Sequence, residues 1–304
     1  MEKVNYKKLD WVYIEQTTYK DVEYLEENYH FHPLDLKDCI GITQRPKIDI
    51  YEDYLFVVLH FPQYDREQRR IRIQELNVFI GPEYIITLTN QPNHGLAEYF
   101  NEYKKKIKRN PEYNILQNSS GYLLYKILDQ MFGASQPVID IIGERLSISE
   151  EEVFRENKRG ATMDLSVVRR NILTYQRLLE PQLRVIDKLV KIDKEFISPE
   201  LSVYFDDIHD GLERTWSILN GYKDTVAGLD RTNETLISQR LNDIIKTLTV
   251  ISVITIVPGL IINFFGMNID LPFADRPKAF FLISSLLVFI MVITYYFLKR
   301  KKLT

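Results

Sequence analysis

The sequence predicts an α+β head, a mixed sheet with helices, followed by a long helical stalk and two C-terminal transmembrane helices. Three observations lead to this prediction. Short β-branched and aromatic runs bounded by turn residues fill the first third of the chain. A heptad stripe without proline follows. Two runs that lack ionisable residues then close the chain, each about as long as a helix needs to cross hydrocarbon.

The head, residues 1–117, combines strand and helix patterns. Charged and apolar residues alternate with helical spacing in two segments, Tyr19–Tyr29 and His94–Lys108. The predicted strands are Trp11–Gln16, Ile48–Tyr51, Tyr54–Phe61, Ile71–Ile80 and Tyr84–Thr89. The sequence NQPN at Asn90–Asn93 marks a loop before the second helix.

Long helices follow in residues 118–198, where the pattern predicts Gly121–Asn157 and Met163–Asp193. The stalk, residues 199–246, carries two apolar seams, and the residues along each seam recur every seven positions. We expect one helix from Glu200 to Phe265. Its length would be on the order of 100 Å, so it needs the two preceding helices or other copies as partners. The seams are Leu201, Ile208, Tyr222, Leu229 and Leu236, and Phe205, Leu212, Leu219 and Val226.

The first span, residues 247–265, has a polar stripe that begins just before it. Stepping by three and four places small or polar side chains on one helical face. Such a face either packs against another helix or lines a water-filled pore, and on the stripe alone packing comes first. If it lines a pore, Ile245 and Ile256 would be dewetting constrictions, with Leu248 sharing the lower one. The stripe consists of Asn242, Ile245, Thr249, Ser252, Ile256, Gly259 and Asn263.

Charge predicts the topology. The connection 266–278 has balanced charges, whereas the tail 299–304 holds four consecutive basic residues. The positive-inside rule therefore places the tail in the cytoplasm, and the second span, 279–298, returns the chain to the side of the head. We expect a multi-pass protein of the cell membrane with both termini cytoplasmic.

Several classes of protein are excluded by what the sequence lacks. The net charge of −3 and the absence of a basic patch argue against nucleic acid as a partner. No nucleotide-binding or hydrolase motif is present, so we expect no enzyme. Cys39 is the only cysteine, which excludes an intrachain disulfide. The five histidines show no metal-ligand spacing among themselves.

The tripeptide Gly266-Met267-Asn268 stands at the end of the first of two C-terminal spans. In that position it resembles the G-M-N signature of the CorA family of divalent-cation (magnesium) transporters. Other matching residues are His32-Pro33-Leu34, Asp38, Arg45-Pro46-Lys47, Tyr204-Phe205, Asp207, Asp210 and Asn242. The resemblance implies a homopentameric, funnel-shaped channel that moves hydrated Mg²⁺, and also Co²⁺ and Ni²⁺, down its electrochemical gradient.

The same resemblance implies roles for acidic residues. It places Asp230 at the funnel wall, and it brings Asp38 and Asp207 together across a subunit boundary to bind regulatory cytosolic Mg²⁺. Two departures stand out: Lys37 replaces the usual Glu before Asp38, and Asn263 replaces a small residue. A zinc-transporting relative of the same family, or a membrane-anchored sensor or scaffold that transports nothing, remain the alternatives. Ion flux would separate them.

Overall fold

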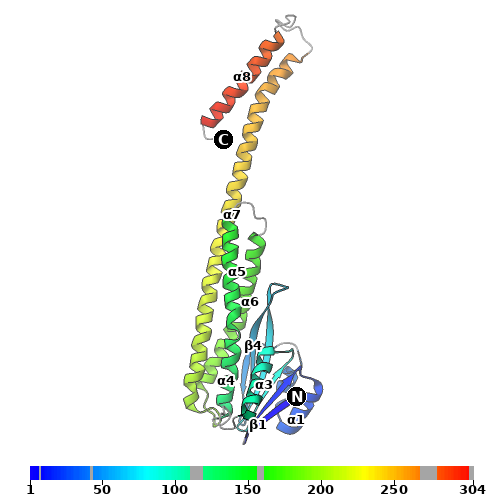
Figure 1. Cartoon of the computed structure of the whole chain (residues 1–304), viewed down its shortest axis with the longest axis vertical. Helices are drawn as coiled ribbons and strands as arrows, with labels where there is room; N and C mark the ends of the chain where they lie inside the picture. The colour runs from blue at the N-terminus through cyan, green and yellow to red at the C-terminus, as the bar shows by residue number, and fades with distance from the viewer. Residues whose placement is uncertain (7, 42–43, 110–118, 156–160, 268–278, 301–304) are drawn as a thin grey trace. The chain divides into compact units, whose positions relative to one another are not determined.

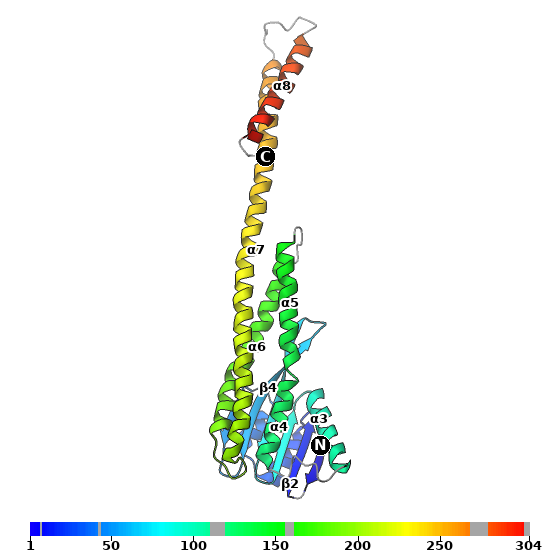
Figure 2. The ribbon, with the colours of Figure 1, turned by 60° about the vertical axis from the view of Figure 1, so that its left-hand side comes forward.

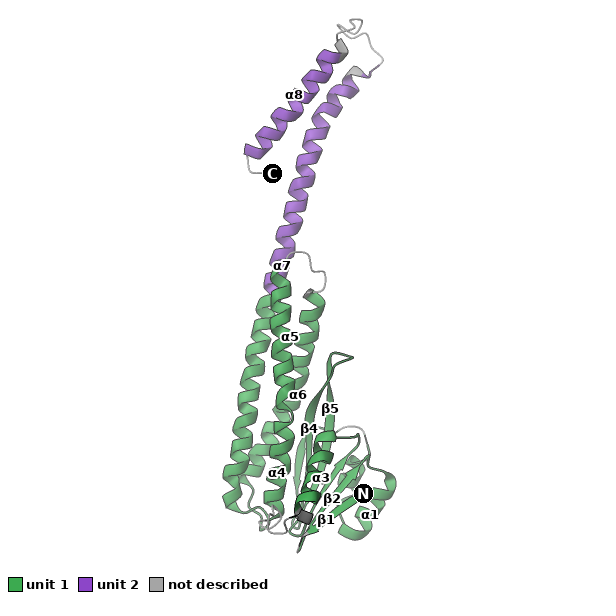
Figure 3. Cartoon of the chain, in the orientation of Figure 1, with its two compact units in different colours: residues 1–230 green, residues 231–304 purple. Residues whose placement is uncertain are grey.

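The computed structural model describes residues 1–304 except 7, 42–43, 110–118, 156–160, 268–278 and 301–304. The chain divides into two compact units, Met1–Asp230 and Arg231–Thr304 (Figure 3). The longest helix, α7, belongs to both, since it runs from Ser202 to Phe265.

The first unit holds a six-stranded mixed sheet in the order β1-β2-β6-β5-β4-β3 (Figure 1). The β2 and β6 strands are parallel and the other pairs antiparallel, with β4 and β5 forming the longest hairpin. The strands are β1 Glu2–Tyr6, β2 Leu9–Glu15, β3 Lys47–Ile50, β4 Leu55–Asp65, β5 Arg70–Ile80 and β6 Tyr84–Thr89. All five predicted strands are present, and the predicted mixed sheet is confirmed.

Helices cover both faces of this sheet. Successive strand residues point to opposite faces. On one face, Phe79 stacks between Phe31 and Phe56, in a cluster that also includes Leu25 of α1, Tyr19–Tyr29, and Leu36 of α2, Pro33–Asp38. On the other face, Trp11 contacts Phe100 and Tyr103 of α3, His94–Arg109. Strands that bury both faces are apolar at nearly every position, as the buried part of β4, residues 55–62, is apart from His60.

The predicted single helix Gly121–Asn157 is wrong: two helices, α4 Ser120–Gly133 and α5 Gln136–Phe154, replace it. The break at Ala134 and Ser135 has a local cause, because Pro137 lacks the amide hydrogen that would bond the carbonyl of Gly133. The α6 helix, Ala161–Lys191, follows. The sequence patterns also missed the edge strand β1 and the six-residue α2, both too short for a clear period.

The predicted stalk helix is confirmed. A 3-10 turn, Pro199–Leu201, leads into α7, and the seam residues Phe205, Leu212, Leu219 and Val226 are buried. Polar contacts add to this packing, since the Gln176 amide of α6 donates to the Asn220 side chain of α7 at 2.8 Å. The stalk therefore packs against the preceding helices as the heptad pattern indicates.

The second unit consists of the C-terminal part of α7 and α8, Ala279–Arg300, which run alongside one another (Figures 1 and 2). Both helices are long and apolar enough to cross a membrane. Only 11% and 6% of the residues in their apolar windows are buried, so these windows are not the core of a soluble fold.

Candidate functional site

The first span presents two different faces. Between Val250 and Ile261, the buried or half-buried residues include Val250, Ile254, Pro258 and Ile261. The other described helix of this unit, α8, has covered residues three or four positions apart: Ile283, Leu287, Ile290, Thr294 and Leu298. These two series are the faces along which α7 and α8 pack.

The polar stripe lies on the opposite side of α7. At about 100° per residue, the middle of the stripe lies roughly half a turn from the middle of the covered face, although Asn242 and Thr249 at the edge of the stripe are nearer to Val250. Asn242, Thr249 and Asn263 are exposed, as are Ile245, Leu248 and Ile256. Ser252 and Gly259 are half-buried. Most of the stripe, apart from Ser252 and Gly259, is therefore left uncovered by α8, which favours a stripe that faces away from that helix.

Thr249 shows how a hydroxyl on the stripe is oriented. Its Oγ1 donates to the carbonyl of Ile245, one turn earlier, at 2.8 Å. A hydroxyl that donates its only hydrogen to its own helix keeps lone pairs for an outside donor. Thr249 can thus accept a hydrogen bond from a water molecule beside the stripe.

The helix ends immediately before the signature. The Gly266 amide bonds to the carbonyl of Ile262 at 2.9 Å, and the Met267 amide to that of Phe264 at 3.4 Å. The Met267 side chain is exposed. Asn268, the third signature residue, lies outside the described residues.

In the head, Asp38 is held by a lysine of the same chain. The Lys47 ammonium lies 2.9 Å from Asp38, 2.6 Å from Asp49 and 3.8 Å from the buried Asp35. Burial opposes the positive charge of Lys47, but hydrogen bonds with Asp49 and Asp38 outweigh it, so the pKa of Lys47 is raised. Burial also raises the pKa of Asp35. Lys47 of the Arg45-Pro46-Lys47 motif thus meets Asp38 in one charge cluster.

Asp207 lies elsewhere in the first unit. It lines a cavity of about 160 Å³ together with Asp129 of α4, Tyr175 of α6 and Arg214. No hydrogen bond or ion pair within the described parts of the chain joins Asp38 to Asp207. Sequence reasoning missed Asp129, because only the packing of α4 on α7 brings its carboxylate to the same cavity.

Asp230 is already paired. Its carboxylate lies 3.3 Å from the Arg169 guanidinium of α6. This pair joins the stalk helix to its neighbour at the last residue of the first unit.

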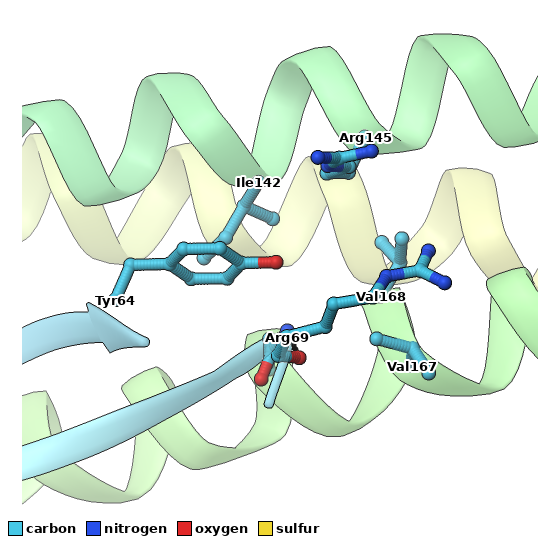
Figure 4. Close-up of a pocket in the computed structure, with 7 residues that line it drawn as sticks. Tyr64, Arg69, Ile142, Arg145, Val167 and Val168 are labelled. Carbon is cyan, nitrogen blue, oxygen red and sulfur yellow. Dashed lines mark hydrogen bonds between the residues drawn. The ribbon is translucent and has the colours of Figure 1, made fainter. Parts of the chain in front are cut away.

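A different cavity lies beneath the tip of the β4–β5 hairpin, where Tyr64 and Arg69 meet Ile142, Arg145 and Val168 (Figure 4). Its volume is about 10 Å³, which is hardly enough for one water molecule. The Arg69 guanidinium pairs with Asp164 at 2.6 Å. We therefore regard this cavity as part of the packing of the hairpin on the helices rather than a ligand site.

One group of metal-ligating side chains was not found from the histidine spacing. Asp206, His209 and Asp210 lie on successive turns of α7, with one possible ligand atom from each within 4.8 Å of the others. Looking for a histidine and a carboxylate three and four residues after Asp206 would have found the group in the sequence.

Known proteins resemble this chain over most of its length. The family model described as "CorA-like Mg2+ transporter protein" matches residues 6–300. YfjQ of Bacillus subtilis is 29% identical over 274 residues, covering 89% of this chain and 82% of its own length. The cobalt/magnesium transport protein CorA of Thermotoga maritima is 23% identical over 282 residues, covering 92% of this chain and 79% of its own.

The fold agrees with solved structures. The CorA magnesium transporter of Methanocaldococcus jannaschii superposes with a TM-score of 0.84 at 18% identity, covering 99% of this chain and 93% of that one. The described fold, with a mixed-sheet head, a long helix and two C-terminal apolar helices, is the CorA fold. The chain belongs to the CorA-like Mg²⁺ transporter family, and is a membrane transporter of divalent metal ions rather than an enzyme.

Proposed function

We propose that this chain forms a homopentameric channel in the cell membrane that conducts hydrated Mg²⁺, and also Co²⁺ and Ni²⁺, into the cell. Both chain termini are cytoplasmic in this proposal. The name of the Thermotoga maritima relative, a cobalt/magnesium transport protein, supports the choice of Mg²⁺ and Co²⁺. Met267 in the signature favours magnesium over zinc by family resemblance.

The observation that carries the proposal is the uncovered polar stripe. A hairpin of two helices cannot enclose a conduit, so several copies must surround one. The faces that α7 and α8 use for each other leave Asn242, Thr249 and Asn263 on the opposite side. A closed ring of copies would turn that face toward the axis, where water and ions would satisfy these polar side chains.

The stripe fits a hydrated ion better than a bare one. Mg²⁺ sheds water reluctantly and prefers oxygen ligands. Neutral groups such as Thr249 and a ring of Asn268 amides can hydrogen-bond its water without trapping a double charge. In the assembled channel, apolar rings are formed by Ile245, Leu248 and Ile256. When water leaves these rings, hydrated ions no longer pass.

The membrane potential supplies the energy. A dication that moves inward gains about 4.6 kcal/mol per 100 mV, twice the value for a single charge. ATP hydrolysis is therefore unnecessary for inward transport, in agreement with the lack of a nucleotide-binding motif.

Cytosolic Mg²⁺ gates the channel in this proposal. Asp207 and Asp129 line a cavity in one subunit, and Asp38 would approach Asp207 from the neighbouring subunit. Ions that bind only the closed state stabilise it by mass action. Lys47, already 2.9 Å from Asp38, and the neighbouring Lys37 would compete with the ion, so the regulatory affinity should be modest.

Uptake into proteoliposomes tests the proposal. We expect flux of Mg²⁺ that Co²⁺ and Ni²⁺ inhibit by competition. A marked preference for Zn²⁺ would instead favour the zinc-transporting alternative, and no flux from correctly inserted protein would favour the sensor or scaffold.

The Asn268→Ala variant tests the signature itself. Removing the amide ring should abolish selective uptake while the oligomer stays assembled, because in this proposal the outer amide ring is what meets the hydrated ion. Crosslinking before uptake controls for assembly. Flux equal to that of the unmodified protein would remove Asn268 from the selectivity filter.

A further inference from the structure

The helix α8 presents one exposed face whose chemistry changes along its length. The residues of this face recur three or four positions apart, so they lie on the same side of the helix. The first four are apolar, the fifth is a tyrosine and the last is an arginine. They are Leu282, Leu286, Phe289, Ile293, Tyr296 and Arg300, and the first five are between 46% and 69% exposed. The covered residues of α8, from Ile283 to Leu298, lie on another side.

The change from apolar to basic residues falls where a bilayer would end. From Ala279 to Leu298, α8 rises by about 29 Å at 1.5 Å per residue. The hydrocarbon core of a bilayer is about 30 Å thick. When the apolar part of α8 spans this core, its last two residues, Lys299 and Arg300, lie at the level of the lipid headgroups. Tyr296 lies one turn earlier, at the interface depth where tyrosine is enriched in membrane proteins.

The positive charges at this end of α8 are not balanced by nearby acids. From Ala279 to Thr304 the sequence contains four basic residues and no acidic residue. Within the described parts of the chain, no carboxylate lies within ion-pair distance of Lys299 or Arg300. By contrast, Lys246, just before the first span, lies 3.5 Å from Asp243. The end of α8 therefore combines uncompensated positive charge with an adjoining apolar face.

We propose that Lys299 and Arg300, together with the hydroxyl of Tyr296, bind the phosphate groups of anionic phospholipids in the adjacent leaflet. Phosphate oxygens accept charge-assisted hydrogen bonds from ammonium and guanidinium groups, and one guanidinium can donate two. Lys301 and Lys302 add two further positive charges in the sequence. Anionic headgroups attract such basic clusters beside a membrane span. The adjoining apolar face fits the acyl chains of the same lipid, which a free phosphate ion lacks.

This lipid site is independent of ion conduction and of the side of the membrane on which the tail lies. It needs only that α8 spans the bilayer, because the apolar face and the basic end belong to the same helix. A chain that conducts no ion would still bind the lipid.

Lipid selectivity in a reconstituted bilayer tests the proposal. The full-length chain is placed in phosphatidylcholine vesicles with a trace of spin-labelled phosphatidylglycerol or spin-labelled phosphatidylcholine. Electron paramagnetic resonance then measures the fraction of each label that the protein immobilises. We expect a preference for phosphatidylglycerol of about tenfold or more, because each basic residue near anionic headgroups changes binding by about fivefold. The double variant Lys299→Gln with Arg300→Gln should reduce that preference by about fivefold or more, and high salt should also reduce it.

Two control variants separate headgroup binding from changes in net charge. Arg184→Gln with Lys191→Gln removes two exposed basic residues of α6 and should leave the preference unchanged. Lys299→Arg with Arg300→Lys keeps both charges at the end of α8 and should keep the preference.

Three outcomes would overturn the proposal. Equal immobilisation of the two labels by the unmodified chain would mean that the basic end of α8 does not bind anionic lipid. A preference that survives in Lys299→Gln with Arg300→Gln would place the lipid site elsewhere on the chain. Loss of the preference when inorganic phosphate is added at constant ionic strength would identify a site for the free ion.

Discussion

The two units of this chain bury their apolar residues to very different extents. In the first unit, Phe56, Phe79 and Leu88 are fully buried. In the second, Leu260, Phe281 and Phe289 are all more than 60% exposed. Exposing such a continuous apolar surface to water is unfavourable in free energy, whereas the hydrocarbon core of a bilayer solvates it. The difference shows that one chain is built for two solvents, with α7 continuing from one to the other.

The charges follow the same division. The first unit contains ion pairs between separate elements. Examples are Lys47 with its three carboxylates and Arg169 with Asp230. Between Lys246 and Phe265 there is no charged side chain. Hydroxyls in that segment instead bond to their own helix, as Thr255 does to the Ile251 carbonyl at 2.9 Å. Internal satisfaction of polar groups is what a hydrocarbon environment requires.

The largest expected effect is on the core of the head. Phe79→Ala should destabilise the first unit by about 3–5 kcal/mol, because it removes a ring stacked between Phe31 and Phe56. Thermal unfolding of the detergent-solubilised chain measures this. The matched change Phe289→Ala, on an exposed face of α8, should leave the unfolding of the head almost unchanged. Equal effects would contradict the contrast in burial.

The second prediction tests the two faces of the first span. Ile256 and Ile262 are each 56% exposed in the chain, but only Ile256 lies on the polar stripe. Ile256→Ser should raise leak flux several-fold by wetting a constriction. Ile262→Ser should not, since it points away from the stripe. Equal flux in both variants, with assembly intact, would make the stripe a packing face.

A third prediction concerns the acids of the first unit. Asp207→Lys should make flux respond little to internal Mg²⁺ in the millimolar range, because it places a cation where the ion would bind. Asp224→Lys makes the same change at an exposed position of α7 and serves as the control. Inhibition of the Asp207→Lys channel like that of the unmodified one would place the sensor elsewhere.

The smallest effect is expected at a surface ion pair. Asp164→Asn removes the partner of Arg69 at the hairpin tip, where both side chains are partly exposed. Such pairs contribute at most about 1 kcal/mol, and salt screens them. Chemical denaturation at low and high salt should show a loss of that size which shrinks as salt is added. A loss as large as that of Phe79→Ala would mean that the pair holds the hairpin on the helices.

Some elements could be predicted from the sequence because local chemistry specifies them. The helix α1 begins and ends where its pattern predicts, and Thr18 and Asp21 form a capping box at its start. The heptad seams predict the buried face of α7, and the uncharged runs predict the two spans. Each signal depends on residues within a few turns of one another.

Only the tertiary structure decided which distant residues meet. The ion pairs of Lys47 with Asp38 and of Arg169 with Asp230 join separate elements, and Asp129 and Asp207 line one cavity from two helices. No local period encodes these arrangements. The side of α7 that packs against α8 was likewise open, since small and polar residues suit both a helix contact and a pore. Periodicity determines which face of an element is apolar, but side-chain packing among whole elements determines what that face touches.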